Sequence, residues 1–414
     1  MSAAILAIGT EITRGEIVNT NASWLADTLV GLGLEVTAME AIPDDKAQIV
    51  ATLRRLSTEH QLILCTGGLG PTTDDMTSEC VATLLGVPLV RDAASLEAIR
   101  ERMARFGRTM ATSNEKQADF PQGAQVLDNR KGTAPGFGVS IGKARAFFMP
   151  GVPREMKTMF TESVSPELSP LVTDAIVQIR VKTFGMPESS VNDRLSGVES
   201  EHDVALAYRA HFPEIEVKVV ARGADRTATE KRARAAADAV IERLGPDVVY
   251  GEGAITFPEA IGELLQAAGL RLGTAESCTG GLVAEVITER GGASAFFDGA
   301  IVSYANHVKT SRLGVSKELL AAHGAVSAET ARAMAQGALD ALGVDVAVAT
   351  TGIAGPTGGS SEKPVGLVHF AVADHKGVSD RQMRFPGSRE QVRKLSAFAV
   401  LALLRNVLRN GHDA

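Results

Sequence analysis

Aromatic residues and cysteines are scarce in this sequence. Only 4% of its 414 residues are aromatic, and its three cysteines are Cys65, Cys80 and Cys278. Three such cysteines give neither a paired disulfide framework nor the spacing of a metal site, which indicates a reducing compartment, the cytoplasm. With few aromatic side chains, the cores are expected to consist mainly of Ala, Val, Leu and Ile, as in parallel sheets covered by helices.

The sequence also lacks an excess of positive charge and a long hydrophobic run. Lys and Arg number 42 against 49 Asp and Glu, a net charge of −7, so no overall positive field would attract nucleic acid or an anionic membrane. No run reaches the roughly 18 apolar residues of a membrane-spanning helix. The first ten residues lack the charged flank and apolar core of a signal peptide. We therefore expect a cytoplasmic protein with neither a nucleic-acid nor a membrane partner.

Strands alternate with helices at both ends of the chain, and a different pattern lies between them. The length allows about two to four domains. The fold class expected is α/β, with two doubly wound α/β domains joined by a small α+β module. In the first domain we expect strands at 3–8, 34–41 and 62–65 and helices at 22–31 and 46–57. In the module we expect strands at 175–184 and 215–222 and helices at 188–196 and 228–244. In the last domain we expect strands at 271–274, 299–303, 345–350 and 366–372 and helices at 257–268, 281–290, 328–342 and 390–408.

Two polar loops follow strands of the first domain. In a parallel doubly wound sheet, ligands bind beyond the carboxyl ends of the strands, and the loops at 9–21 and 66–75 both lie at that edge. Glycines in the second loop let backbone N–H groups approach an anion, and its paired carboxylates suit a hard cation that bridges phosphate oxygens. The alternative is an ordinary turn before a helix whose first turn favours Asp. The candidate residues are Glu11, Asn19, Gly67, Gly68, Gly70, Asp74 and Asp75.

A second group of small polar residues lies in the last domain, at 274–281, TAESCTGG, where a strand should lead into a helix. Ser277 could act there as a nucleophile if a desolvated lysine with a lowered pKa, Lys309, takes its proton. Other interpretations stay open. Ser and Thr are common helix N-caps, and Lys309 could be an exposed helix lysine. Cys278 could be a thiol nucleophile, although no His is positioned to lower its pKa, and His307 could be the base.

An apolar strand at 347–356, AVATTGIAGP, ends in a glycine-rich turn that suits an anion or an oxyanion. Arg393, on the final helix, is a candidate phosphate ligand through its guanidinium fork, and a solvated helix arginine is the equal alternative. The candidate binding residues around Ser277 are Glu276, Thr279, Gly280, Thr350, Thr351, Gly352, Gly355 and Arg393.

Five blocks of the last domain resemble the C-terminal domain of the CinA family, the nicotinamide mononucleotide deamidases. They are TAESCTGGLVAEVIT, GAIVSYANHVKTSRLGV, HGAVS, TGIAGPTGG and EKPVGLVHFAVA. The resemblance implies that Ser277 is the nucleophile, Lys309 the general base, and Tyr304 a residue that relays the proton or holds the lysine. The amide of nicotinamide mononucleotide would be hydrolysed to the acid with release of ammonia, without a cofactor.

Four blocks of the first domain resemble the molybdopterin-binding-like domain of the same family. They are GTEITRGEIVNTN, TGGLGPTTDD, KGTAPGF and MPGVPREM. The resemblance implies an ADP-ribose pyrophosphatase that depends on a divalent metal (Mg, Mn or Co), with K+ also implicated. Asp74 and Asp75 would bind the metal and Lys131 the phosphate. Arg154 and Glu155 could equally form a surface pair at a helix start.

The family comparison also gives domain limits and partners. The expected domains are 1–170, 174–253 and 255–414, and the middle one is similar to the KH-like domain of the family. Its turn Gly185-Met186-Pro187-Glu188 departs from the GXXG loop that clamps nucleic acid, so the charged helix face is interpreted as solvated. The family forms homodimers, and the expected ligands are the two nucleotides, nicotinamide mononucleotide and ADP-ribose. A rival of another class is a non-enzymatic protein that binds a pterin or nucleotide and regulates competence or the response to DNA damage.

Overall fold

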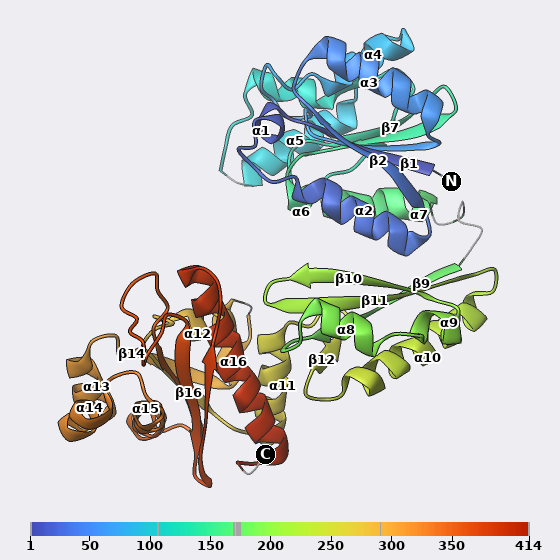
Figure 1. The fold of residues 1–414 in the computed structure, drawn as a ribbon. Coiled ribbons are helices and arrows are strands. Elements are labelled where there is room, and N and C mark those ends of the chain that lie inside the picture. Colours follow the sequence, from blue (N-terminus) through green and yellow to red (C-terminus); the bar gives the residue numbers. More distant parts are fainter. Residues whose placement is uncertain (1, 106, 169, 171–174, 290, 413–414) are drawn as a thin grey trace. The chain divides into compact units, whose positions relative to one another are not determined.

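The computed structural model describes residues 2–105, 107–168, 170, 175–289 and 291–412 (Figure 1). Contacts divide the chain into two compact units, Met1–Val177 with Arg222–Thr229, and Gln178–Ala221 with Glu230–Ala414. The predicted limits at Met1, Asp174, Arg290 and Ala414 lie outside the described residues. Within the described ranges, every helix is too short or too polar to cross a membrane.

The first unit is built on a six-stranded sheet with the order β2-β1-β3-β8-β7-β6. Its strands are β1 (Ser2–Ile8), β2 (Glu35–Ile42), β3 (Leu62–Thr66), β6 (Gln125–Leu127), β7 (Gly136–Ile141) and β8 (Ala144–Met149). The first four in the order are parallel, as expected, whereas β7 and β6 run antiparallel to their neighbours. The reversal follows from the short connection between β7 and β8, where Gly142 has a φ of +59° that a tight hairpin needs.

Helices cover both faces of this sheet because β1 is apolar on both. Ala3 and Ile5 face a core formed with α2 (Thr20–Leu32) and α6 (Pro153–Met159). Ala4, Leu6 and Ile8 face a second core formed with α3 (Lys46–Glu59) and α4 (Thr77–Leu85). Figure 1 shows these two helix layers on opposite sides of the strands. The remaining elements are α1 (Thr10–Thr13), β4 (Leu89–Arg91), α5 (Ala93–Arg105), η1 (Thr112–Ala118), β5 (Asp119–Pro121), η2 (Phe160–Val164) and α7 (Ser165–Leu168).

The middle module is an α+β fold on a four-stranded sheet with the order β10-β11-β9-β12. Its elements are β9 (Ala175–Thr183), α8 (Glu188–Arg194), α9 (Val198–His202), β10 (Ala205–His211), β11 (Glu214–Gly223), α10 (Arg226–Leu244) and β12 (Val249–Glu252). Ala236, Ala237 and Val240 of α10 pack on Val217 and Val219 of β11. The sequence analysis predicted two of the four strands and missed β10 and β12.

The last part of the chain folds on a five-stranded sheet with the order β14-β13-β15-β16-β17. Its strands are β13 (Leu272–Glu276), β14 (Phe297–Val302), β15 (Val346–Gly352), β16 (Leu367–Asp374) and β17 (Gly377–Arg384). Its helices are α11 (Phe257–Ala268), α12 (Leu282–Thr288), η4 (Ala293–Ala295), α13 (Asn306–Leu313), α14 (Lys317–His323), α15 (Ala328–Leu342) and α16 (Arg389–Asn410). The strands β14, β13 and β15 are parallel, whereas β16 and β17 are antiparallel.

The two faces of this sheet carry side chains of different size. Ala347, Ala349 and Ala371 face α15, so that helix lies against a surface of small residues. Val348 and Phe370 face α11 and α16 on the other side. The α/β class with two doubly wound domains and an α+β module is confirmed, although neither large sheet is purely parallel. The parallel strands of the last sheet bring three loops to one edge.

Candidate active site

The loops that follow β13, β14 and β15 meet at the carboxyl edge of the sheet. Ser277 comes directly after β13, and its backbone N–H donates to Thr350 O at 3.0 Å. Ser303 comes directly after β14, and its N–H donates to Glu276 O at 2.7 Å. The peptide group that joins Glu276 to Ser277 is therefore held from both sides, by the chain of β15 and by the end of β14.

Ser277 and Lys309 are in direct contact. The Nζ atom of Lys309 lies 3.0 Å from Ser277 Oγ, 2.6 Å from Ser303 O and 3.3 Å from Tyr304 O. Lys309 is 1% exposed and Ser277 9% exposed. Burial lowers the pKa of Lys309 because desolvation disfavours the ammonium. A neutral amine suits these partners, since two N–H groups can donate to the carbonyls while the lone pair accepts the serine proton.

The groups around Lys309 do little to stabilise its charged, ammonium form. Within the part of the chain that the structure describes, its partners are a hydroxyl and two carbonyl oxygens, with no carboxylate. Neutral acceptors stabilise an ammonium less than a carboxylate does. The lysine is therefore suited to take up and release a proton.

Tyr304 contacts Lys309 through its backbone and not through its phenol. Its carbonyl oxygen accepts the lysine hydrogen bond, whereas its Oη accepts one from Arg389 Nη2 at 3.2 Å. The residue is 60% exposed. Of the two roles predicted for Tyr304, holding the lysine agrees with this geometry.

Glu276 was predicted to bind substrate, but its carboxylate is used inside the protein. It is fully buried and accepts hydrogen bonds from the backbone N–H groups of Gly281, Val283 and Ala284 at 2.9–3.0 Å. These are among the unpaired N–H groups at the start of α12, whose N-cap residue Gly281 has no side chain to cap them. Glu276 therefore anchors the start of α12 next to Ser277.

The predicted threonine ligands are also bonded internally. The hydroxyls of Thr279 and Thr350 lie 2.7 Å apart, and both residues are buried. Thr351 Oγ1 donates to Ala325 O at 2.6 Å. Arg393 donates from Nε and Nη2 to Thr279 O at 3.1 and 2.7 Å. These hydrogen bonds hold the turn that carries Ser277 and its neighbouring loops in place. The side chains of the threonines and of Arg393 therefore have structural partners within the protein.

Three predicted glycines lie where a side chain would not fit or would be strained. A Cβ on Gly352 would lie 2.7 Å from Leu367 O, and a Cβ on Gly355 would lie 2.6 Å from Val365. Gly280 has a φ of +62°, in the left-handed region that favours glycine. The glycines at 352 and 355 therefore allow the turn after β15 to pack closely on the chain at 365–368, and Gly280 allows the tight turn after Ser277.

The alternative nucleophile and base are unsuited by their surroundings. Burial raises the pKa of the Cys278 thiol to about 12, which keeps it protonated near neutral pH. His307 is exposed on α13. The sequence analysis missed two other residues. Arg389 bonds to Tyr304 and Gly355 from the first position of α16, and Ser303 Oγ is buried without a hydrogen-bond partner among the described residues.

A separate cavity of about 520 Å³ lies in the first unit. It contains most of the residues predicted for a phosphate and metal site. These are Glu11, Asn19, Gly67, Gly68, Gly70, Asp74 and Asp75. Asn19 also caps α2, because its Oδ1 accepts from Ala22 N at 3.0 Å. Glu155 lines the same cavity and accepts from Asn129 Nδ2 at 2.7 Å, so it is not a surface partner of Arg154.

Lys131 was predicted to bind phosphate, but it does not line this cavity. Its backbone N–H and that of Gly132 both donate to Asn129 Oδ1, at 3.0 and 2.8 Å. This turn leaves the Lys131 side chain exposed. A different lysine, Lys116, reaches the loop and donates to the backbone oxygens of Thr72 and Asp75.

The glycine-rich loop of the first unit is tightly constrained. Gly67 has a φ of +102°, and a Cβ there would lie 2.0 Å from Ile8 O. The Asp75 carboxylate accepts from Thr72 N at 2.9 Å. A hydrogen bond from Thr72 is the main reason why the pKa of Asp74 is lowered. The loop therefore presents an ionised Asp74 beside a constrained backbone turn.

The donor set of this cavity fits a magnesium-like ion only in part. Among the described residues, no group of three or more His, Cys, Asp or Glu side chains is arranged to hold a metal. Carboxylate oxygens are nevertheless the right ligands for such an ion, which often takes one or two carboxylates and completes its shell with water and substrate phosphate. Asp74 and Asp75 are the side chains that would contribute.

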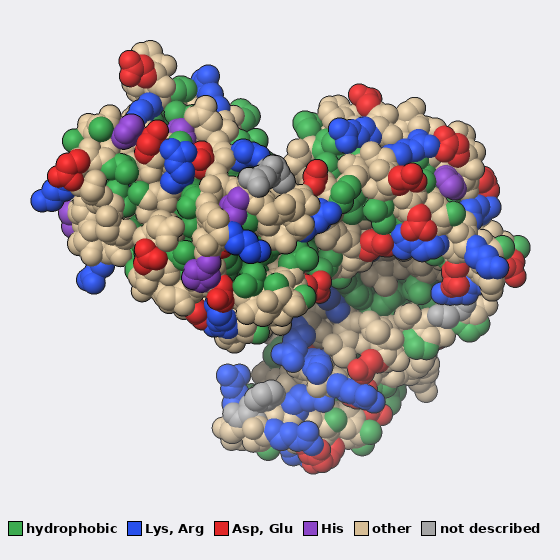
Figure 2. Space-filling view, turned by 90° about the horizontal axis from the view of Figure 1, so that it is seen from below, with side chains coloured by type: hydrophobic (Ala, Val, Ile, Leu, Met, Phe, Trp, Pro, Cys, Tyr) green, Lys and Arg blue, Asp and Glu red, His purple; other side chains and the backbone are tan. Residues whose placement is uncertain are grey.

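The basic face of α10 is neutralised by acidic neighbours. Arg232 pairs with Asp203 at 2.7 Å, and Arg234 pairs with Glu252 and Asp238 at 2.7 Å. In Figure 2, Lys and Arg side chains lie among Asp and Glu side chains over the two upper lobes of the view, whereas those on the lower lobe lie mostly together. These ion pairs favour the interpretation of α10 as a solvated helix and not a nucleic-acid surface.

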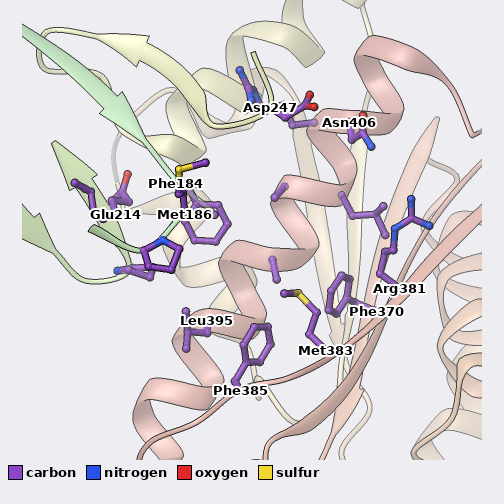
Figure 3. A pocket seen from close by; sticks show the side chains of 18 of the residues that line it. Phe184, Met186, Glu214, Asp247, Phe370, Arg381, Met383, Phe385, Leu395 and Asn406 are labelled. Carbon is purple, nitrogen blue, oxygen red and sulfur yellow. The ribbon is translucent and has the colours of Figure 1, made fainter. Parts of the chain in front are cut away.

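A larger cavity, about 860 Å³, lies elsewhere in the second unit (Figure 3). Its walls are mainly apolar and include Phe184, Phe370, Met383, Phe385 and Leu395. It contains none of the residues predicted for catalysis. The largest of these cavities is therefore separate from the candidate active site, the Ser277–Lys309 contact.

Family models match three consecutive parts of the chain. They are a probable molybdopterin binding domain at residues 4–170, a damage-inducible protein CinA KH domain at 178–251, and a CinA C-terminal domain at 255–408. A CinA-like protein of Anaeromyxobacter dehalogenans (strain 2CP-C) is 44% identical over 412 residues, 99% of this chain and 100% of that protein. A CinA-like protein of Geobacter sulfurreducens is 42% identical over 414 residues, 99% of each chain. A crystal structure of a competence/damage inducible protein from Agrobacterium tumefaciens is 42% identical, with 38% of this chain and 98% of that one covered and a TM-score of 0.36.

Proposed function

Because this chain belongs to the CinA family, being 44% identical over 412 residues to a CinA-like protein, we propose that its C-terminal part is an amidase. Its substrate would be nicotinamide mononucleotide and its products nicotinate mononucleotide and ammonia. The observation that carries the proposal is the 3.0 Å contact between Lys309 Nζ and Ser277 Oγ. Burial that lowers the lysine pKa supports it, because only the neutral amine can act as a base.

The reaction would proceed by two acyl transfers. Neutral Lys309 takes the Ser277 proton while Oγ attacks the amide carbon, and the resulting ammonium then protonates the departing nitrogen, which leaves as ammonia. Water, deprotonated by the same lysine, cleaves the serine ester and releases the carboxylate product. The developing oxyanion needs N–H donors, a role we assign to the backbone turns after β13 and β15.

The experiment is ammonia release by Ser277→Ala. Removal of a nucleophile that acts with its base should lower the rate about a thousandfold or more, while circular dichroism and thermal unfolding stay near wild type. Ser294→Ala, at an exposed serine of the same domain, is the matched control and should keep full activity. Undiminished turnover by Ser277→Ala would eliminate the serine mechanism.

A second activity, hydrolysis of ADP-ribose to AMP and ribose 5-phosphate, is proposed for the first unit. It is supported by the 520 Å³ cavity, which combines Glu11, Asp74 and Asp75 with the Gly67-Gly68 turn. A divalent metal (Mg, Mn or Co) held by Asp74 and Asp75 would neutralise phosphate charge and activate water. The glycine turn would bind a phosphate through backbone N–H groups. K+ belongs to the proposal on family grounds alone.

Asp74→Asn tests this second activity. The substitution should stop release of AMP and leave ammonia release unchanged, and a chelator should do the same to wild type. If Asp74→Asn removes both activities together, the two sites are not independent.

Cytoplasmic location and a homodimer complete the proposal, and sedimentation of the full chain tests the latter. The rival is a regulatory protein that binds a pterin or nucleotide without turning it over. Binding of either nucleotide by the wild type without any product would favour that rival.

A further inference from the structure

Three basic side chains lie at or near the Ser277 site, and two of them already have partners inside the protein. Lys309 is buried against Ser277. Arg393 is half-buried and directs both Nε and Nη2 to one backbone oxygen, that of Thr279. The side of the guanidinium that would grip a phosphate with two parallel bonds is thus used to hold the catalytic turn. Arg393 is therefore poorly placed to recognise an anion.

Arg389 is the third cation, and its side chain is exposed. Its Nη1 donates to Gly355 O at 2.8 Å and its Nη2 to Tyr304 Oη at 3.2 Å. A guanidinium has five N–H donors, so these two bonds leave others for a ligand. The Tyr304 hydroxyl accepts from Arg389 and keeps its own O–H to donate.

Contacts connect Arg389 to the reacting atoms in two steps. Tyr304 gives its carbonyl oxygen to Lys309 and its phenol oxygen to Arg389. The guanidinium thus lies about one tyrosine side chain beyond the lysine that touches Ser277. It also ties the loop after β14 to the turn after β15 through Gly355.

We propose that Arg389 binds the phosphate of the substrate and makes the site select a nucleotide over the corresponding nucleoside. This inference depends on the amidase function proposed above. Arg389 would donate charge-assisted hydrogen bonds to the phosphate oxygens, and the Tyr304 hydroxyl would add one more. Arg393 positions the Thr279 turn and does not touch the phosphate.

The test compares nicotinamide mononucleotide with nicotinamide riboside, which has the same amide and no phosphate. Arg389→Gln should reduce the ratio of kcat/KM for the nucleotide to that for the riboside about 10- to 100-fold, the range for lost bonds to a charged group. Most of the loss should be in KM, and Arg389→Lys should recover part of it. Arg393→Gln should lower kcat/KM for both substrates by the same factor, so that their ratio stays that of wild type.

An unchanged ratio in Arg389→Gln, or a reduced ratio in Arg393→Gln alone, would overturn the inference. A wild type that releases ammonia from neither compound would overturn the amidase proposal instead. In that case, calorimetric titration with ribose 5-phosphate, which needs no turnover, still tests whether Arg389 binds a phosphate. Wild type should bind it, and Arg389→Gln should lose at least about tenfold in that affinity, whereas Asp74→Asn in the first unit should not. Equal binding by wild type and Arg389→Gln, or none by wild type, would refute the phosphate site.

Discussion

Replacing Lys309 by arginine places a permanently charged side chain at this position. It removes the neutral amine, which is the only form of lysine that can act as a base. Arginine stays protonated in proteins, whereas burial lowers the pKa of Lys309. A lysine with the ordinary pKa of about 10.4 is neutral at pH 7 in only about four molecules in ten thousand. Each unit by which the pKa falls raises that fraction about tenfold.

The size of the effect follows from the role of the amine. General base catalysis contributes about 10²- to 10⁴-fold, or roughly 3–5 kcal/mol of barrier. We expect Lys309→Arg to lose at least that factor in ammonia release. The wild-type rate should rise about tenfold per pH unit while Lys309 is mostly charged, and should level off above its pKa. The arginine variant should lack this rise.

The same pKa makes stability depend on pH in a defined direction. Between the lowered pKa of folded Lys309 and its ordinary value, the unfolded chain binds more protons than the folded one. The free energy of unfolding should therefore increase with pH across that window, and Lys309→Met should remove this increase. Lys317→Arg, at an exposed lysine, is the matched control for both assays. The reasoning fails if Lys309→Arg keeps its rate within about tenfold of wild type, with the same pH profile.

Three further substitutions test supporting residues. Glu276→Gln weakens the acceptor of three backbone N–H groups and should cost about 1.5–3 kcal/mol of unfolding free energy in urea titrations; unchanged stability would contradict its anchoring role. Cys278→Ala should keep ammonia release within a few-fold of wild type, because burial raises the thiol pKa to about 12; a loss as large as that of Ser277→Ala would point to the thiol. Gly67→Ala should lower the melting temperature of the first unit and abolish AMP release, since its Cβ would lie 2.0 Å from Ile8 O, and unaltered melting would show that the loop can rearrange.

Most of the parallel strands could be predicted from the sequence, including the edge strands β2 and β14, whereas the exposed edge strands β10 and β17 and the buried hairpin strands β7 and β8 were missed. Strands such as β3 are continuous apolar runs that are buried along their whole length, and such runs are the strongest signal for a central strand. In contrast, β17 has the sequence GVSDRQMR and is half-exposed to exposed throughout, as is most of β10. In β10 and β17, hydrogen bonds to a single neighbour define the strand, and no apolar pattern marks it.

The same contrast applies to the site. Sequence motifs singled out Ser277 and Lys309 because their residue types suit the chemistry, and the two atoms lie 3.0 Å apart. The motifs could not tell whether Glu276 faces a ligand or the backbone, which depends on how the chain turns at Gly281. The exposed position of Lys131 likewise depends on the turn closed by Asn129 Oδ1.

Arginine side chains at both ends of α16 donate hydrogen bonds to backbone oxygens of other segments. Its first turns carry Arg389 and Arg393, which hold the loops around Ser277, and its last turns carry Arg405 and Arg409, which donate to Pro246 O of the middle module. A helix of 22 residues is about 33 Å long. Because it is one continuous helix, a tilt at one end also moves the other end. A displacement of the module at Pro246 would thus reach, through this one helix, the loops around Ser277 that Arg389 and Arg393 hold.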